Sequence, residues 1–142
     1  MSTNSTVAVV HTNGTVSQIY VHWDGYIEGA GKCLVENYTT LDKVEVLLAL
    51  GNLSCLEARP APDANEPHNF IDSAKGVCVA YYRDRGERKQ QAEVFVSIDE
   101  FISQGRSEEY NYLFSSGQWF VRDQDNFRGT VKAALAEMGK LM

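Results

Sequence analysis

The chain has 142 residues, of which 44% are apolar and 23% are charged, a composition typical of a globular protein rather than a disordered one. Its formal net charge is −6, which argues against a protein that follows nucleic-acid phosphates along a basic face. The sequence contains no apolar run of the roughly 18 residues that predict a transmembrane helix.

The cysteines and histidines give little sign of a metal or disulfide framework. Cys33, Cys55 and Cys78 are odd in number, lack Cys-x-x-Cys spacing and are expected to be buried, reduced thiols. The three histidines are scattered, so no metal site is predicted. The polar residues 1–5 lack the basic and apolar segments of a signal peptide, and we therefore expect a cytoplasmic protein.

Two segments rich in β-branched residues, 6–11 and 16–23, predict neighbouring strands at the start of the chain. An Asn-Gly pair between them tolerates the positive φ angles of a tight turn. We therefore expect an antiparallel hairpin, with Tyr20 and His22 on the same face of its second strand.

Two helices are expected next, over residues 31–38 and 41–50, because apolar side chains recur in both at helical spacing. Thr39 or Thr40 is the expected N-cap of the second helix. All three prolines lie in residues 57–73, where little periodicity is present, and this segment is predicted to be a loop.

The second half of the chain alternates between predicted strands and helices. Residues rich in β-propensity predict a strand over 76–83 and another over 93–96. Ser97 begins a capping box and a short helix that ends at Gly105. The remaining expected elements are a strand over 110–114, a strand over 118–122 and a last helix from residue 126 or 127 to residue 141.

These elements predict an α+β fold in one domain over residues 1–142, with about six strands and four helices. Hairpins dominate the prediction, so we expect a largely antiparallel sheet with the helices packed on one side.

The segment from His22 to Tyr26 is the first candidate site, because aromatic, ionisable and flexible residues gather where a strand ends. In one interpretation, Trp23 and Tyr26 cover the core while Asp24 caps a turn. In a second, the rings stack on a flat ligand whose edges His22 and Asp24 bind. In a third, Asp24 orients His22 as a general base, although no serine or cysteine is paired with them.

The Gly29-Ala30-Gly31-Lys32 segment invites comparison with a phosphate-binding loop, since backbone amides at a helix start attract anions. The spacing differs from a Walker loop, because Tyr26 stands where that motif requires glycine. The alternative is that the glycines make a bend and that Lys32 is solvated.

A second cluster begins at Tyr81 and continues to Lys89, with Tyr82, Arg83 and Arg85 as its candidate binding residues. Arg83 or Arg85 offers a planar fork to a phosphate or carboxylate, with Tyr82 beside it. The alternative is a local lattice of ion pairs around the intervening aspartate, which contributes little when exposed.

Several segments together form a pattern: the Ser2-Thr3-Asn4-Ser5-Thr6 start with its strand, Ile19–Tyr26, Gly31–Tyr38, Tyr81–Glu87, and Glu109–Phe114 with Trp119. In this pattern the sequence resembles a group of small, mostly uncharacterised proteins of tailed bacteriophages and prophages. Tyr82 departs from that group, in which histidine often stands before the Arg-Asp-Arg run.

The resemblance implies a phage context, with no established enzyme activity and no cofactor. Small acidic phage proteins often disable a host factor by binding it. We therefore expect a non-catalytic, anti-CRISPR-like inhibitor that binds an effector protein of a host defence system in the cytoplasm of the infected bacterium. An acidic surface suits a basic nucleic-acid-binding face of such an effector.

Another class of function is a binder that sequesters a nucleotide signal, with rings to stack the base and cations to hold phosphates. An enzyme acting on such a nucleotide is a third hypothesis. Neither a membrane nor a nucleic acid is an expected partner, and a homo-oligomer is left open. The residues of the sequestering site are Trp23, Tyr26, Lys32, Arg83 and Arg85.

Overall fold

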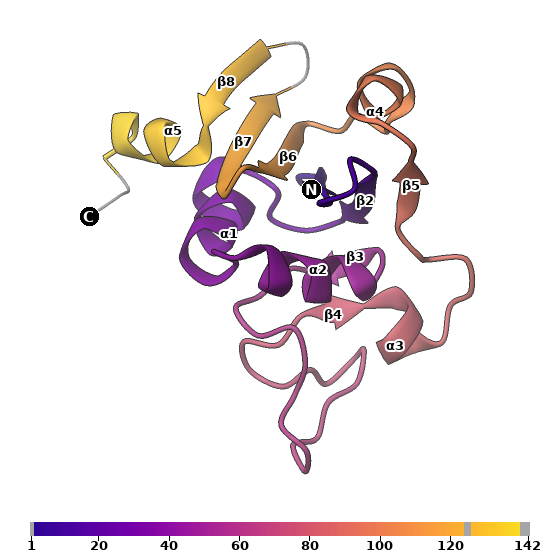
Figure 1. Cartoon of the computed structure of the whole chain (residues 1–142). Helices are drawn as coiled ribbons and strands as arrows, with labels where there is room; N and C mark the ends of the chain where they lie inside the picture. Colours follow the sequence, from indigo (N-terminus) through magenta and orange to yellow (C-terminus); the bar gives the residue numbers. More distant parts are fainter. Residues whose placement is uncertain (1, 124–125, 140–142) are drawn as a thin grey trace.

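The computed structural model describes residues 2–123 and 126–139 and arranges them around one eight-stranded sheet (Figure 1). The strands are β1 (Ser5–Val10), β2 (Val16–Val21), β3 (Leu53–Cys55), β4 (Val79–Ala80), β5 (Glu93–Phe95), β6 (Tyr110–Ser115), β7 (Gln118–Asp123) and β8 (Asn126–Thr130). The helices are a π-helical turn η1 (Ile27–Gly31), α1 (Lys32–Asn37), α2 (Leu41–Ala49), α3 (Tyr81–Arg85), α4 (Ile98–Gln104) and α5 (Val131–Glu137).

The sheet is mixed, and its strand order is β4-β3-β2-β1-β6-β7-β8, with β5 also paired to β2. The pairs β1–β6 and β2–β3 are parallel. The other pairs are antiparallel, namely β1–β2, β2–β5, β3–β4, β6–β7 and β7–β8. This arrangement confirms the predicted α+β class.

The predicted hairpin of β1 and β2 is confirmed and sets the register of the sheet centre. Val10 lies opposite Val16, and the turn between them is closed by a hydrogen bond from the His11 amide to the Thr15 carbonyl (2.8 Å). Gly14 adopts a φ of 87°, which the turn requires and which glycine adopts without steric cost.

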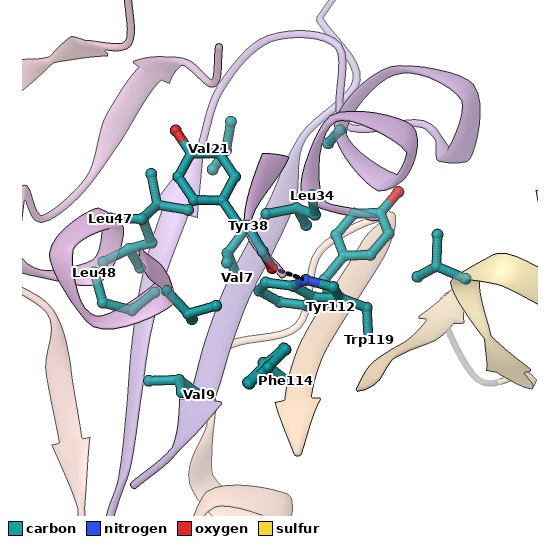
Figure 2. Packing of buried hydrophobic residues seen from close by; sticks show 14 of the residues in the cluster. Val7, Val9, Val21, Leu34, Tyr38, Leu47, Leu48, Tyr112, Phe114 and Trp119 are labelled. Carbon is teal, nitrogen blue, oxygen red and sulfur yellow. Dashed lines mark hydrogen bonds between the residues drawn. The ribbon is translucent and has the colours of Figure 1, made fainter. Parts of the chain in front are cut away.

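One face of the sheet, called here the inner face, packs the main core beneath α1, α2 and α5 (Figure 2). Alternate residues of β1 and β2, including Val7 and Val21, point into this core, as the period of a strand requires. The indole Nε1 of Trp119 donates a hydrogen bond to the main-chain oxygen of Tyr38 (2.9 Å), so the buried polar group of this ring is satisfied.

The opposite, outer face is covered in part by α4, the helix that follows β5. Ala8 and Val16 point to this side and form a small second cluster with Phe95, against which Phe101 of α4 packs. The helices α1, α2 and α5 thus share one side as expected, whereas α4 lies on the other.

Two of the expected elements are wrong in extent. The strand expected over 76–83 is limited to β4, because the side chain of Asp84 accepts a hydrogen bond from the Ala80 amide (2.8 Å) and turns the next residues into α3. The last helix begins at Val131 rather than near residue 126, since Thr130 caps it and the preceding residues pair with β7 as β8. The helix ends at Glu137, earlier than expected, and residue 141 itself lies outside the described residues.

The N-caps predicted for two other helices are confirmed. Thr40 caps α2 and Ser97 caps α4, each by accepting a backbone hydrogen bond from the third residue after it. Apart from an isolated bridge at Arg59, the proline-rich segment 57–73 contains no helix or strand, as predicted. Strands β3 and β8 were not predicted, and β3 lies beside the candidate site.

Candidate functional site

A row of rings follows the end of β2 on the outer face of the sheet. Tyr20 and His22 alternate with core residues of β2 and therefore point outward. The Tyr20 hydroxyl shares a hydrogen bond with Nδ1 of His22 (2.7 Å), and the His22 ring meets the Trp23 ring edge to face at 4.7 Å. Trp23 is 42% exposed, so its indole lies at the surface, beside a histidine that is already hydrogen-bonded.

Arg106 extends this row from the loop that follows α4. Its guanidinium carbon lies 4.1 Å from the centroid of the Tyr20 ring, a cation–π contact, and its Nε donates to Glu108 (2.6 Å). The side chain of Gln18 holds the loop in place through two hydrogen bonds of 2.9 Å with the backbone of Arg106. Burial and the nearby Glu108 carboxylate raise the pKa of Tyr20 above its ordinary value.

The predicted pairing of His22 with Asp24 is not formed. The Nδ1 atom of His22 engages Tyr20 and lies 3.4 Å from the side-chain nitrogen of Asn4. Asp24 has a φ of 56°, and its main-chain oxygen accepts a hydrogen bond from the Ala30 amide (2.9 Å). Its backbone therefore shapes the bend, while its side chain is exposed.

The charge of Asp24 nevertheless affects its surroundings. Burial, followed by the negative charge of Asp24, raises the pKa of Glu57 above its ordinary value. Burial also raises the pKa of the Cys55 thiol, and both carboxylates add to this effect. A raised thiol pKa reduces the thiolate fraction at neutral pH, so Cys55 is a poor nucleophile.

The glycines of the Gly29–Lys32 segment serve packing. A Cβ atom at Gly29 would lie 2.5 Å from the main-chain oxygen of Asp24, and one at Gly31 would lie 3.1 Å from Val131 of α5. Lys32 begins α1 on the inner side of the molecule and its Nζ lies 4.0 Å from Glu36. Among the described residues, no hydrogen bond, ion pair or ring contact joins it to Trp23 or to the arginines of α3.

Arg83 ties α3 to the proline-rich loop. Its guanidinium donates to the main-chain oxygens of Pro60 (2.6 Å) and Cys78 (2.7 Å) and to both carboxylate oxygens of Asp84. Asp84 also lies 3.0 Å from Nε2 of His68, and these two side chains are only 4% and 2% exposed. The Ala74 amide donates to Nδ1 of His68, which places the ring proton on Nε2, facing Asp84.

This network determines the ionisation of Asp84. Burial alone would raise its pKa, but hydrogen bonds from Arg83, from the Ala80 amide and from His68 lower the pKa overall. Most donors of Arg83 are thereby occupied inside the fold, and its guanidinium is a structural clamp rather than an open phosphate fork.

Tyr82 and Arg85, by contrast, face solvent. Tyr82 is 54% exposed. The guanidinium carbon of Arg85 lies 4.7 Å from the ring centroid of Phe70 and 5.9 Å from that of Tyr81, and its Nε forms an ion pair with Oε2 of Glu87 at 2.8 Å. Arg85 thus stacks on the Phe70 ring and pairs with Glu87 through Nε, while the rest of its guanidinium can contact a partner.

Strand β3 brings the two predicted clusters to neighbouring positions. The Trp23 amide donates to the Ser54 carbonyl (3.0 Å), and the Tyr81 amide donates to the Asn52 carbonyl (3.3 Å) at the other end of β3. We call the residues that gather here the aromatic surface: Tyr20, His22, Trp23, Phe70, Tyr81, Arg85 and Arg106.

Sequence reasoning placed Tyr81 in the second cluster without assigning it a binding role, and it missed Phe70 and Arg106. The strand pattern, which places Tyr20 and His22 on one face, was the signal that could have identified Tyr20 as part of the site. Phe70 and Arg106 lie in loops far along the chain, and only the folded backbone brings them to the site.

Comparisons with family models, with curated proteins and with solved structures found no match to this chain. Within residues 2–123 and 126–139, no group of His, Cys, Asp or Glu side chains is arranged to hold a metal ion. No helix in this part of the chain is long and apolar enough to cross a membrane.

Proposed function

We propose that this protein binds a partner protein through the aromatic surface and acts without catalysis. The observation that carries the proposal is the exposed indole of Trp23, which packs against the hydrogen-bonded rings of His22 and Tyr20. Tryptophan, tyrosine and arginine dominate the binding energy of protein interfaces. Side chains that are ordered before binding also lose less conformational entropy when a partner arrives.

The phage resemblance supplies the partner class of this proposal, an effector protein of a bacterial defence system. Such effectors present basic faces to nucleic acids, and the net charge of −6 favours association with a basic surface. The protein would then occupy the face that the effector uses for its nucleic acid.

Sequestration of a nucleotide is the weaker candidate. It needs Lys32 and Arg83 beside Trp23, yet Lys32 belongs to α1 and Arg83 is occupied by Asp84 and two carbonyl oxygens. The groove between α4 and the outer face of β6 and β7 is lined by residues other than these three.

The test combines capture from host lysate with phage growth on hosts that carry defence systems. The proposal expects the wild-type protein to recover a defence effector and restore phage growth. We expect Trp23→Ala and Arg85→Ala each to weaken the interaction by about tenfold or more. Val46→Ala, which removes an exposed apolar side chain on α2, is the matched control and should bind normally.

Recovery of no defence component, together with no rescue of phage growth, would overturn the proposal. Undiminished binding by folded Trp23→Ala would overturn the assigned surface. Calorimetry against cyclic and ADP-ribose-type nucleotides completes the test, because tight binding without turnover would favour the nucleotide hypothesis instead.

A further inference from the structure

Helix α4 carries apolar side chains that nothing in the described chain covers. None of its residues is buried, and Ile98 and Ile102 are 37% and 73% exposed. Together with Phe101 they form one wall of a groove whose other wall is the outer face of β6 and β7, where Leu113 lies opposite Phe120. The groove has a volume of about 360 Å³, which falls within the range of small-molecule sites.

Two arginines line this groove, although the chain as a whole is acidic. Arg106 is stacked on Tyr20 and partly neutralised by Glu108. The guanidinium of Arg122 makes only a long contact of 3.4 Å to Ser107 Oγ, and among the described residues it has no carboxylate partner. Arg122 is therefore the group best able to attract an anion to the groove.

The other polar residues of the groove are already satisfied. Gln18 uses both ends of its amide on the backbone of Arg106. The Asn111 oxygen accepts hydrogen bonds from Thr6 (2.8 Å) and from the Glu108 amide (2.9 Å), and its nitrogen donates to the Glu108 carbonyl (2.9 Å). The groove thus offers a ligand apolar walls and guanidinium groups, with few free polar partners for a sugar or a base.

We propose that this groove binds an amphiphilic monocarboxylate, with its acyl chain along α4 and its carboxylate on Arg122. Arginine pairs with a carboxylate through parallel N–H donors, and each methylene removed from water strengthens binding. The seven residues of α4 span roughly 10 Å, which suits a medium-length acyl chain better than a long peptide helix. The inference is independent of the proposed function, although Arg106 belongs to both surfaces.

The experiment titrates ¹⁵N-labelled protein with decanoate, decanol and decylamine below their micelle concentrations. We expect decanoate to shift the amide signals of α4, β6 and β7, and to bind more tightly than decanol and far more tightly than decylamine. Arg122→Gln should weaken decanoate binding about tenfold while leaving decanol binding unchanged. Ile102→Glu, a change at an exposed position, should abolish binding without lowering the melting temperature.

Lys43→Gln provides the matched control, because it removes a cation from α2 on the inner side and should leave binding intact. Equal binding of the three probes, or unchanged decanoate binding in Arg122→Gln, would overturn the proposal. So would a folded wild-type protein that binds no decanoate. Groove shifts caused by a Leu- and Glu-rich amphipathic peptide but not by decanoate would replace it with a peptide-docking surface.

Discussion

Replacing Asp84 by asparagine tests whether the clamp on the proline-rich loop stabilises the whole fold. The carboxylate receives hydrogen bonds from Arg83 at 2.8 and 2.9 Å and from the Ala80 amide at 2.8 Å, and Nε2 of His68 lies 3.0 Å away. Asparagine has nearly the same shape but only one acceptor atom. Its NH₂ group would face donors at one of the two oxygen positions.

The expected cost follows from burial. The Asp84 side chain is 4% exposed, so a donor left without an acceptor is not rescued by water. Removing one partner of a buried ion pair costs about 3–5 kcal/mol. Because Arg83 is 28% exposed and keeps its two carbonyl acceptors, we expect the low end, about 3 kcal/mol.

Urea denaturation at pH 7 measures this loss as a change in the free energy of unfolding. Asp42→Asn, at a site in the first turn of α2 that faces solvent, is the control and should change stability by less than about 0.5 kcal/mol. Since the folded pKa of Asp84 is lowered, its contribution is complete above the ordinary pKa of about 4 and is lost as pH falls through the folded value. The gap between wild type and Asp84→Asn should therefore narrow below pH 4. A loss under about 1 kcal/mol at pH 7, or a gap that is independent of pH, would refute the reasoning.

Other predictions concern the backbone, the core and one carboxylate. Gly51→Ala and Gly117→Ala each place an alanine at a positive φ, 78° and 77° respectively. Only at Gly51 would the new Cβ also clash with the backbone, at 2.2 Å from the Gln90 carbonyl oxygen. Urea melts should show about 1–2 kcal/mol lost at Gly117 and clearly more at Gly51, and equal losses would contradict this. Trp119→Phe removes a buried indole donor and should lower stability by roughly 1–3 kcal/mol in thermal melts, whereas an unchanged melting temperature would count against the hydrogen bond. NMR titration should place the pKa of Glu57 above its ordinary value, and Asp24→Asn should lower it; an unmoved midpoint would show that the two charges do not interact.

The sequence predicted the elements whose signals are local. The Asn-Gly turn, the Thr40 cap and the Ser97 cap each depend on residues within a few positions, and all three are confirmed. The strand expected over 76–83 failed because its β-rich composition was outweighed by contacts to Asp84 and by Gly86, which ends α3 at a φ of 74°. Strands as short as β3 carry no periodicity that a sequence pattern can reveal.

The candidate site shows the same division between local and long-range causes. The cluster of aromatic residues around Trp23 could be predicted, because its members lie within a few positions of one another in the sequence. The different environments of Arg83 and Arg85 were not visible in the sequence, since they depend on which residues of the loop fold back onto α3. The Pro60 carbonyl of the loop accepts a hydrogen bond from Arg83, whereas Phe70 stacks on Arg85 at the surface. Two arginines separated by a single residue thus acquire different roles.

The two faces of the sheet separate stability from binding. Residues of β2 that point inward, such as Val21, belong to the main core, while Tyr20 and His22 on the same strand point to the aromatic surface. Trp23 and Arg85 are 42% and 54% exposed, so substitutions there remove surface contacts without opening a cavity in that core. Loss of partner binding in these variants would therefore report on recognition itself. The clamp at Arg83 differs, because a substitution there loosens the loop that carries Phe70 and would weaken binding indirectly, with a matching fall in stability.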